Sequence, residues 1–585
     1  MRGRLLVILA CLVLAAAFLP GSVFSSGSAA AGSGGATLSQ TLKQWLGTAE
    51  SGSTIHAIVT FDSRSSLSKI DTLNVGATKL SSLPIAFATL TAAQVRQVAS
   101  WPEVVSVWHD QQNTFVLDES VALIGADKVR SGSGLKRGYT GAGVNVAVID
   151  TGVDGTHPDL PYGTKVDQLV AAGNPFESEP VTFTPAPTGD TYGHGTHVSS
   201  IIGGLGTASA GRFTGVAPGA HIQMFKTDVG AFLLDSYALA SFDWILSHPE
   251  ANIRVSSNSW GCCAGVDYSP DDPVSVATKS LYDHNVTVVF SAGNDGGPNT
   301  LSPYCESPWV MCAASGTKEM KLSSFSSRGR ISGNWDRTQA QKTNSGLYRP
   351  GITAPGSDIE AARSSMGALV ADGVDPDNPM YTTLSGTSMA APHIAGTIAL
   401  MLEARPKLTT QNVIDILENT TTNMPSYELF ETGMGYLNAY AAVVAAEKGK
   451  VHFPPSVNGK TPQFTLLTSS PFSGTALTDT WQLAQCPDTT PGQILQHHQF
   501  TVAAGTDVVY TEVSWGDETQ LLYLRLYDPS CNVAAESAAL LDIGNVSHRA
   551  LAVTAPAPGT WTVGVYGRVN VPTNYTGVFQ TYDKS

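Results

Sequence analysis

Charged residues are scarce in this sequence, and basic residues are scarcer than acidic ones. Asp, Glu, Lys and Arg make up 14% of the 585 residues, well below the roughly 25% that is usual for soluble domains. The chain has 33 Lys and Arg against 48 Asp and Glu, which gives a formal net charge of −15 at pH 7. A nucleic-acid-binding protein needs a basic surface that displaces counterions from phosphates. We therefore expect no nucleic-acid partner.

Long hydrophobic runs are absent except at the N-terminus. Residues 5–19 form an unbroken apolar run that follows Arg2 and Arg4 and precedes a stretch of small residues. These are the three parts of a secretory signal peptide, and the run is shorter than the roughly 20 residues that a transmembrane helix needs. An uncleaved membrane anchor is the alternative. We expect a signal peptide over residues 1–31, a secreted extracellular protein, and no membrane span once the signal is removed.

Cysteine is also sparse, with seven in the chain. Cys11 would leave with the signal peptide, and an even number of cysteines in an exported protein favours disulfides. No Cys-x-x-Cys spacing indicates a zinc site. We expect Cys486 and Cys531 to pair with each other. The sequence leaves open how the other four pair: Cys262, Cys263, Cys305 and Cys312.

Apolar strands alternate with longer helices between about residues 140 and 445. Residues 144–149 and 286–290 are apolar nearly throughout, as strands covered on both faces must be. This alternation predicts an α/β fold built on a doubly wound parallel sheet. The expected helices span residues 235–247, 274–284 and 410–418.

Different patterns flank this central region. Before it, strand-like residues 55–61 and 104–108 enclose a helix expected at residues 90–100, which indicates a small α+β unit. After about residue 450, short strand-like runs are separated by Gly, Pro, Asp and Asn. That pattern is typical of an antiparallel β-sandwich or jelly roll.

Three segments of the central region carry the groups that acyl transfer uses. Asp150 ends a buried strand, His194 lies between glycines at the start of a helix, and Ser388 opens a long apolar helix. A hydroxyl can attack a carbonyl, an imidazole can take and return its proton, and a buried carboxylate can orient that imidazole. Asn294 follows another strand, and its amide could donate to a developing oxyanion.

The order Asp, His, Ser with these flanking residues resembles the subtilisin-like serine proteases, the subtilase family. The likeness covers about residues 120–445. Several separate motifs in the family's order carry it. Its further landmarks are residues 215–218, 257–261 and 353–356.

The resemblance implies a role for each matching residue. Asp150, His194 and Ser388 would form the catalytic triad, and Asn294 would stabilise the oxyanion. No cofactor would be needed for catalysis. The substrate-binding residues would be Ser259, Trp260, Gly261, Ala292 and Gly293.

The resemblance also suggests how the whole chain is divided. Residues 32–115 resemble the subtilase propeptide, which assists folding and inhibits the enzyme until it is removed. Residues 116–447 would be the catalytic domain. Residues 448–585 resemble the pre-peptidase type of β-sandwich domain that follows the catalytic domain in many secreted proteases.

A structural calcium ion is the one metal that the resemblance brings in. Several subtilases hold Ca²⁺ with an aspartate equivalent to Asp159 and an Asn-containing loop after the histidine helix. In this chain the loop, residues 204–211, has no Asn or Asp. Calcium needs oxygen ligands, so the sequence does not support the usual family site.

Taken together, these features predict a secreted serine endopeptidase made as an autoprocessed pre-pro-enzyme. Its partners would be polypeptide substrates and its own propeptide as an intramolecular inhibitor, and we expect a monomer. The alternative is a catalytically silent, protease-shaped binding or adhesion protein. A lipase is disfavoured because Ser388 lies in Gly-Thr-Ser-Met-Ala and not in Gly-x-Ser-x-Gly. His197 and His393 are expected to pack in the core.

Overall fold

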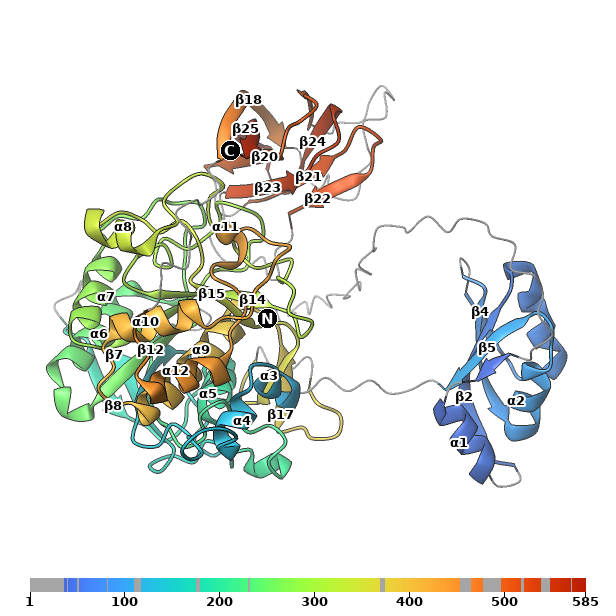
Figure 1. The fold of residues 1–585 in the computed structure, drawn as a ribbon, viewed down its shortest axis with the longest axis horizontal. Helices are drawn as coiled ribbons and strands as arrows, with labels where there is room; N and C mark the ends of the chain where they lie inside the picture. The colour runs from blue at the N-terminus through green and yellow to red at the C-terminus, as the bar shows by residue number, and fades with distance from the viewer. Residues whose placement is uncertain are drawn as a thin grey trace, which may run out of the picture. The chain divides into compact units, whose positions relative to one another are not determined.

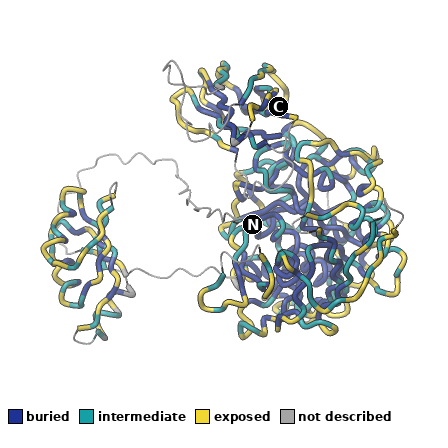
Figure 2. The backbone as a smooth tube through the Cα atoms, turned by 180° about the vertical axis from the view of Figure 1, so that it is seen from behind, coloured by how far each residue is buried: buried dark blue, intermediate teal, exposed yellow. Residues whose placement is uncertain are grey.

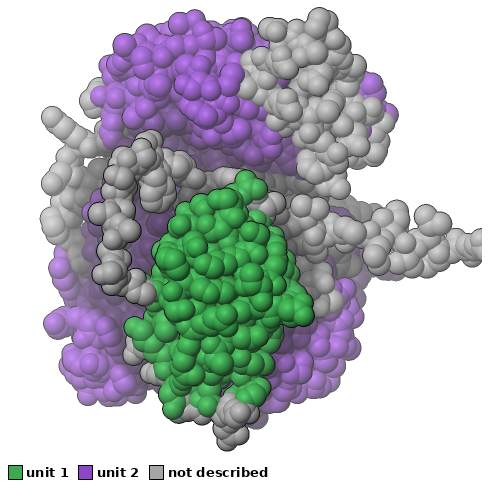
Figure 3. Space-filling model, turned by 90° about the vertical axis from the view of Figure 1, so that its right-hand side faces the viewer, with its two compact units in different colours: residues 1–114 green, residues 115–585 purple. Residues whose placement is uncertain are grey.

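The computed structural model divides into two compact units, residues 1–114 and residues 115–585 (Figure 3). The expected signal peptide, residues 1–31, and Cys486 lie outside the residues that the structure describes. Among the described residues, no helix is both long and apolar enough to cross a bilayer. The described residues are 36–38, 40–49, 52–80, 83–109, 117–174, 179–229, 232–368, 374–452, 464–476, 496–516, 520–537, 548–569 and 571–584.

The first unit contains a five-stranded sheet with the strand order β1-β5-β2-β4-β3. Alternate residues of β2, from Ile55 to Phe61, are buried in one core with Val95 and Val98 of α2. Helix α2 begins two residues later than expected, because β4 continues to Thr91, whose side chain caps the helix. The elements are β1 (Thr37–Leu38), α1 (Gln40–Thr48), β2 (Thr54–Phe61), η1 (Arg64–Leu73), β3 (Thr78–Lys79), β4 (Ile85–Thr91), α2 (Ala92–Ala99) and β5 (Val104–His109).

The second unit begins with an eight-stranded sheet of order β15-β14-β13-β12-β6-β9-β7-β8 (Figure 1). All neighbouring strands are parallel except β7 and β8. The strands are β6 (Asn145–Asp150), β7 (Val166–Ala172), β8 (Thr182–Pro185), β9 (His221–Lys226), β12 (Ile253–Asn258), β13 (Thr287–Ser291), β14 (Met311–Gly316) and β15 (Ile352–Pro355).

Helices cover both faces of this sheet, as β6 shows. Val146 and Val148 belong to one hydrophobic core with residues of α5 and α9, whereas Ala147 and Ile149 belong to a second core with residues of α6 and α7. Figure 2 shows buried residues, in dark blue, concentrated in the interior of the larger unit. The predicted doubly wound α/β fold is therefore confirmed. The helices are α3 (Leu117–Leu123), α4 (Ala126–Ser131), α5 (His194–Gly203), α6 (Asp235–Ser247), α7 (Pro273–Asp283), α8 (Arg337–Thr343), α9 (Thr387–Ala404), α10 (Thr410–Asn419), α11 (Leu429–Thr432) and α12 (Ala439–Lys448).

Short elements join these layers. Strands β16 and β17 form an antiparallel pair, as do β10 and β11. Their bounds are β10 (Asp228–Val229), β11 (Phe232–Leu233), β16 (Ile359–Ala362) and β17 (Tyr381–Leu384), with short 3-10 turns at η3 (Thr207–Ser209) and η4 (Pro249–Ala251).

The C-terminal part is a β-sandwich, as predicted. Two antiparallel four-stranded sheets, of orders β18-β25-β20-β23 and β19-β24-β21-β22, enclose a core that includes Trp515 and Trp561. The strands are β18 (Phe464–Ala476), β19 (Gln496–Val502), β20 (Val508–Trp515), β21 (Leu521–Tyr527), β22 (Val533–Glu536), β23 (His548–Thr554), β24 (Gly559–Arg568) and β25 (Thr573–Lys584).

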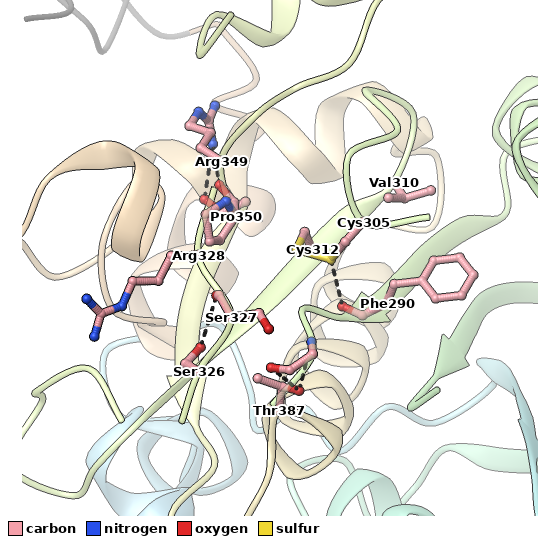
Figure 4. The surroundings of a disulfide bond; sticks show 12 residues. Phe290, Cys305, Val310, Cys312, Ser326, Ser327, Arg328, Arg349, Pro350 and Thr387 are labelled. Atoms are coloured by element: carbon pink, nitrogen blue, oxygen red, sulfur yellow. Dashed lines mark hydrogen bonds between the residues drawn. A yellow bond between two sulfur atoms is a disulfide. The ribbon is translucent and has the colours of Figure 1, made fainter. Parts of the chain in front are cut away.

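Disulfides link neighbouring positions in the described chain. Cys305 pairs with Cys312 of β14 (Figure 4), and Cys262 pairs with Cys263 in the loop after β12. Cys531 is also disulfide-bonded, and its expected pairing with Cys486 stays a prediction.

Candidate active site

Asp150 is the last residue of β6 and lies at the carboxyl end of the parallel sheet, where open α/β sheets place their sites. Its side chain is 3% exposed. Asp150 Oδ1 accepts hydrogen bonds from the Thr151 backbone N–H at 2.7 Å and from His194 Nδ1–H at 2.8 Å. Because a carboxylate can only accept, this contact places the proton of neutral His194 on Nδ1. His194 Nε2 is then the basic nitrogen.

His194 is the first residue of α5, and its side chain is 15% exposed. Burial by itself lowers the pKa of this imidazole, whereas the charge and hydrogen bond of Asp150 and the charge of Asp190 raise it. The carboxylates prevail, so the pKa of His194 lies above the ordinary value of 6.5. The site therefore stabilises the protonated imidazole that a general base becomes once it has taken a proton.

Asp190 is a buried residue of this site that the sequence did not single out. Its Oδ1 accepts from Gly193 N at 2.7 Å and Thr151 Oγ1 at 2.9 Å, and its Oδ2 accepts from Thr196 N at 2.8 Å and Thr196 Oγ1 at 2.6 Å. These bonds tie the start of α5, which carries His194, to the residue after Asp150. One feature of the sequence could have identified Asp190: it lies just ahead of a helix, and carboxylates cap helix N-termini.

Ser388 is the second residue of α9, and it is held at the end of β12. Ser388 Oγ donates to the Ser259 carbonyl at 3.1 Å, and Ser259 Oγ donates to the Ser388 carbonyl at 2.8 Å. Both His194 and Ser388 are described, and no hydrogen bond joins them. Catalytic hydrogen bonds are often long or poorly aligned until substrate binds.

Asn294 follows β13 and contacts the start of α9. Its Oδ1 accepts from the Thr387 backbone N–H at 2.8 Å and from Thr387 Oγ1 at 2.9 Å. Since a backbone N–H must donate, Oδ1 is the atom that faces Thr387, and Nδ2 is left to donate elsewhere. A Cβ placed on Gly386 would lie 3.6 Å from both Asn294 Nδ2 and Ser388 N. Two hydrogen-bond donors thus border the same space.

Comparison with known proteins shows the family to which the part of the chain that carries this site belongs. Residues 141–436 match the model of the subtilase family, peptidase S8, and this match spans half of the chain. The chain belongs to the subtilase family.

Curated relatives of this subtilase include named proteases. Subtilisin E of Bacillus subtilis (strain 168) is 28% identical over 370 residues, which are 61% of this chain and 80% of that protein. Serine protease AprX of the same strain is 30% identical over 339 residues, which are 54% of this chain and 68% of that protein. Fervidolysin of Fervidobacterium pennivorans is 30% identical over 321 residues, which are 52% of this chain and 41% of that protein.

The residues of this subtilase that we expect to bind substrate follow β12 and β13, which are adjacent parallel strands. Ser259 and Trp260 come directly after β12, and the Trp260 ring packs edge-on against Phe290 with centroids 5.0 Å apart. Gly261 is exposed. Ser259 and Ser388 exchange two hydrogen bonds, so the loop after β12 lies beside Ser388.

The two expected residues after β13 differ from each other. Gly293 is half-buried, and its N–H donates to Thr387 Oγ1 at 3.2 Å. Ala292 is fully buried; its N–H donates to Ala313 O at 3.0 Å and its carbonyl accepts from Ser302 N at 3.1 Å. Ala292 therefore contributes to the core that holds the loop. A substrate-binding role for these residues stays a prediction.

The two other histidines near the site are core residues, as expected. His197 and His393 are both fully buried. Burial lowers the pKa of His197 to about 3 and that of His393 to about 4. Both imidazoles are therefore neutral at ordinary pH.

The calcium position suggested by the family resemblance does not fit the residues present in this subtilase. Asp159 is fully buried; its Oδ1 accepts from Ala208 N at 3.0 Å and its Oδ2 accepts from the Tyr381 hydroxyl at 2.7 Å. The loop after α5 thus offers Asp159 a hydrogen-bond donor, whereas Ca²⁺ requires oxygen ligands. Among the described residues, no three His, Cys, Asp or Glu side chains are grouped to hold a metal ion.

Proposed function

We propose that this subtilase is a serine endopeptidase that hydrolyses peptide bonds in proteins. The observation that carries the proposal is the 2.8 Å hydrogen bond from His194 to the buried carboxylate of Asp150. This bond orients the imidazole and leaves Nε2 to act as the base, which is the role that acyl transfer by a serine requires.

The reaction would proceed through an acyl-enzyme. Ser388 Oγ attacks the peptide carbonyl while His194 Nε2 takes the hydroxyl proton, and His194 then gives this proton to the leaving amine. The oxyanion accepts hydrogen bonds from Ser388 N–H and Asn294 Nδ2. A water molecule, deprotonated by His194, releases the acyl group and restores the hydroxyl.

Covalent labelling tests the proposed nucleophile. A fluorophosphonate probe, which reacts with activated serines, should label the mature enzyme once per chain, and mass spectrometry of the labelled peptide should locate the probe on Ser388. Casein hydrolysis should stop as labelling is completed. Labelling at another residue, or casein hydrolysis that continues in the fully labelled enzyme, would contradict the proposal.

We also propose that the protein is secreted as a zymogen and acts as a monomer. Residues 1–31 would direct export, and residues 32–115 would form an inhibitory propeptide ahead of the catalytic domain (116–447) and the sandwich domain (448–585).

The sheet of the first unit supports the proposed propeptide role, because Ile58 lies between Phe87 and Trp108, which are 38% and 49% exposed. An exposed apolar face of this kind suits a partner surface. N-terminal sequencing and mass measurement of the secreted, active species test these boundaries.

The raised pKa of His194 predicts where activity is lost at low pH. Only the neutral imidazole can take the serine proton, so kcat/KM should fall as the pH drops through the pKa of His194. We expect the midpoint of this acid limb above 6.5, the ordinary pKa of a histidine. The measurement is a pH profile of kcat/KM for a peptide substrate whose own charge is constant. A midpoint at or below 6.5 would be inconsistent with the electrostatics of the site.

Removal of the Asn294 amide should slow the chemical step. Asn294→Ala is expected to lower kcat by about 10²- to 10³-fold with little change in KM, as happens for the corresponding asparagine of subtilisin, because the oxyanion loses one donor. Asn145 is a matched control at the opposite end of β6, where its amide donates to Ala251 O at 2.6 Å. Asn145→Ala should leave kcat per active site unchanged. An Asn294→Ala enzyme with unaltered kcat would remove Asn294 from the oxyanion hole.

A further inference from the structure

A fully buried arginine of the sandwich reaches the loop that carries Asn294. Arg549 belongs to β23, and its side chain is 0% exposed. Arg549 Nη1 donates to Asp295 Oδ1 at 2.8 Å, and Asp295 is the next residue after Asn294. The Asp295 side chain is 19% exposed, so the ion pair is largely shielded from water. Attraction between opposite charges is strong where water is excluded.

The backbone of the same loop lies directly against β23. Gly297 has φ +72°, and a Cβ at this position would come within 2.0 Å of the Ala550 carbonyl oxygen. Only glycine allows this approach. Two residues further on, Asn299 Nδ2 donates to Glu512 Oε2 of β20 at 3.3 Å. The segment after Asn294 is therefore packed against two adjacent strands of the sandwich.

The loop after β12 contacts the same strand. Gly265 has φ +78°, and a Cβ there would come within 2.8 Å of the His548 ring. His548 and Arg549 are consecutive residues of β23, so one strand of the sandwich contacts both loops that we expect to form the substrate cleft. These loops begin at Ser259 and at Ala292.

An apolar contact fixes the sandwich in this position. Ile331, Trp335 and Phe430 of the α/β part share one hydrophobic cluster with residues of the sandwich. The sandwich residues in the cluster are Phe464, Val508, Tyr510, Ala550 and Tyr582. Because Ala550 belongs to both this cluster and the contact with Gly297, the position of Arg549 is set by a packed core.

We propose that Arg549 is a positioning residue for the oxyanion hole and that the sandwich remains part of the active enzyme. Asn294 lies between two anchors, Thr387 on one side and the Asp295–Arg549 pair on the other. Oxyanion stabilisation depends on donors that are already in place when charge develops. The inference rests on the proposed peptidase function, since it assigns the sandwich a part in that reaction.

The test compares Arg549→Met with wild type in the full-length, processed enzyme. We expect kcat to fall by about 10- to 100-fold with KM nearly unchanged, because a small displacement of a catalytic group can reduce the rate by that amount. Asp295→Asn, which keeps the size of the side chain, should lower kcat in the same way, and Arg549→Lys should restore part of the activity. Arg525 is the matched control: it pairs with Glu536 within the sandwich at 2.6 Å, and Arg525→Met should leave kcat unchanged.

A merely structural role for Arg549 would give a different pattern. If Arg549 acts through Asn294, Arg549→Met should cause little further loss of kcat in an Asn294→Ala background, after active-site titration of each variant. An equal loss in both backgrounds, or unchanged kcat in folded Arg549→Met or Asp295→Asn, would overturn the inference. So would an active secreted species whose mass excludes residues 464–584. If wild type does not hydrolyse peptides at all, the proposed function fails, and so does the inference that rests on it. Should Arg549→Met not fold, Asp295→Asn decides the question.

Discussion

Replacement of Ser388 by alanine is expected to reduce kcat for peptide hydrolysis by about 10⁶-fold, the loss that removal of the corresponding serine causes in subtilisin. Without the hydroxyl no acyl-enzyme can form. The fold should survive, because within the described part of the chain Ser388 Oγ makes one hydrogen bond, to the Ser259 carbonyl at 3.1 Å. Loss of such a bond costs about 1 kcal/mol of unfolding free energy, and alanine favours the helix that Ser388 opens.

The measurement has three readouts: kcat with a chromogenic peptide, fluorophosphonate labelling, and the size of the secreted chain. Ser388→Ala should show no labelling, and its proposed propeptide should stay attached if the enzyme processes itself. Ser385→Ala is a suitable control. Ser385 lies three residues before the proposed nucleophile, and its hydroxyl contacts Asp358. The activity of Ser385→Ala should match that of wild type. Casein hydrolysis and labelling that persist in Ser388→Ala would point to contamination or to another nucleophile. A wild type that folds but never labels would favour the binding or adhesion protein.

Much of the central fold could be predicted from local patterns in the sequence. The apolar runs at residues 144–149 and 286–290 correspond to β6 and β13, because strands covered on both faces carry no polar side. The helix expected at 274–284 is α7, displaced by one residue because Asp272 caps it and Pro273 opens it. Such signals lie within a few residues of the element that they specify.

The features that sequence reasoning missed depend on contacts between distant segments. Arg549 and Asp295 are 254 positions apart, and neither has a local pattern that marks it. Asp190 has a local helix-capping signal, but its link to the residue after Asp150 is the hydrogen bond from Thr151, 39 positions away. The disulfides were open for a different reason, because cysteine spacing does not say which sulfurs meet; the structure joins Cys262 to its neighbour Cys263. Local signals did single out the four candidate residues, since Asp150 ends a strand, Asn294 follows one, and His194 and Ser388 lie at the starts of helices.

Asp150→Asn is expected to lower kcat by about 10⁴-fold, although it keeps the shape of the side chain. The asparagine amide can donate to the imidazole, which would leave His194 with its proton on the wrong nitrogen. The pH dependence of the remaining activity should change as well. In wild type the Asp150 carboxylate raises the pKa of His194 against the effect of burial. Without that charge, Asp190 remains to oppose the effect of burial, so the pKa of His194 should fall and the acid limb of kcat/KM should move to lower pH.

A partly exposed Asp–His pair on the same sheet provides the control for this shift. Asp167 Oδ2 lies 3.1 Å from His221 Nε2, and the two side chains are 47% and 30% exposed. Asp167→Asn removes a carboxylate beside a histidine without touching the site, so both kcat and the acid limb should stay as in wild type. If the acid limb of Asp150→Asn is unmoved, the limb reports a group other than His194. If it moves to higher pH, the Asp150 carboxylate does not raise the pKa of His194, which contradicts the electrostatics of the site. A shift to lower pH in Asp150→Asn alone would identify His194 as the base and Asp150 as the group that sets its pKa.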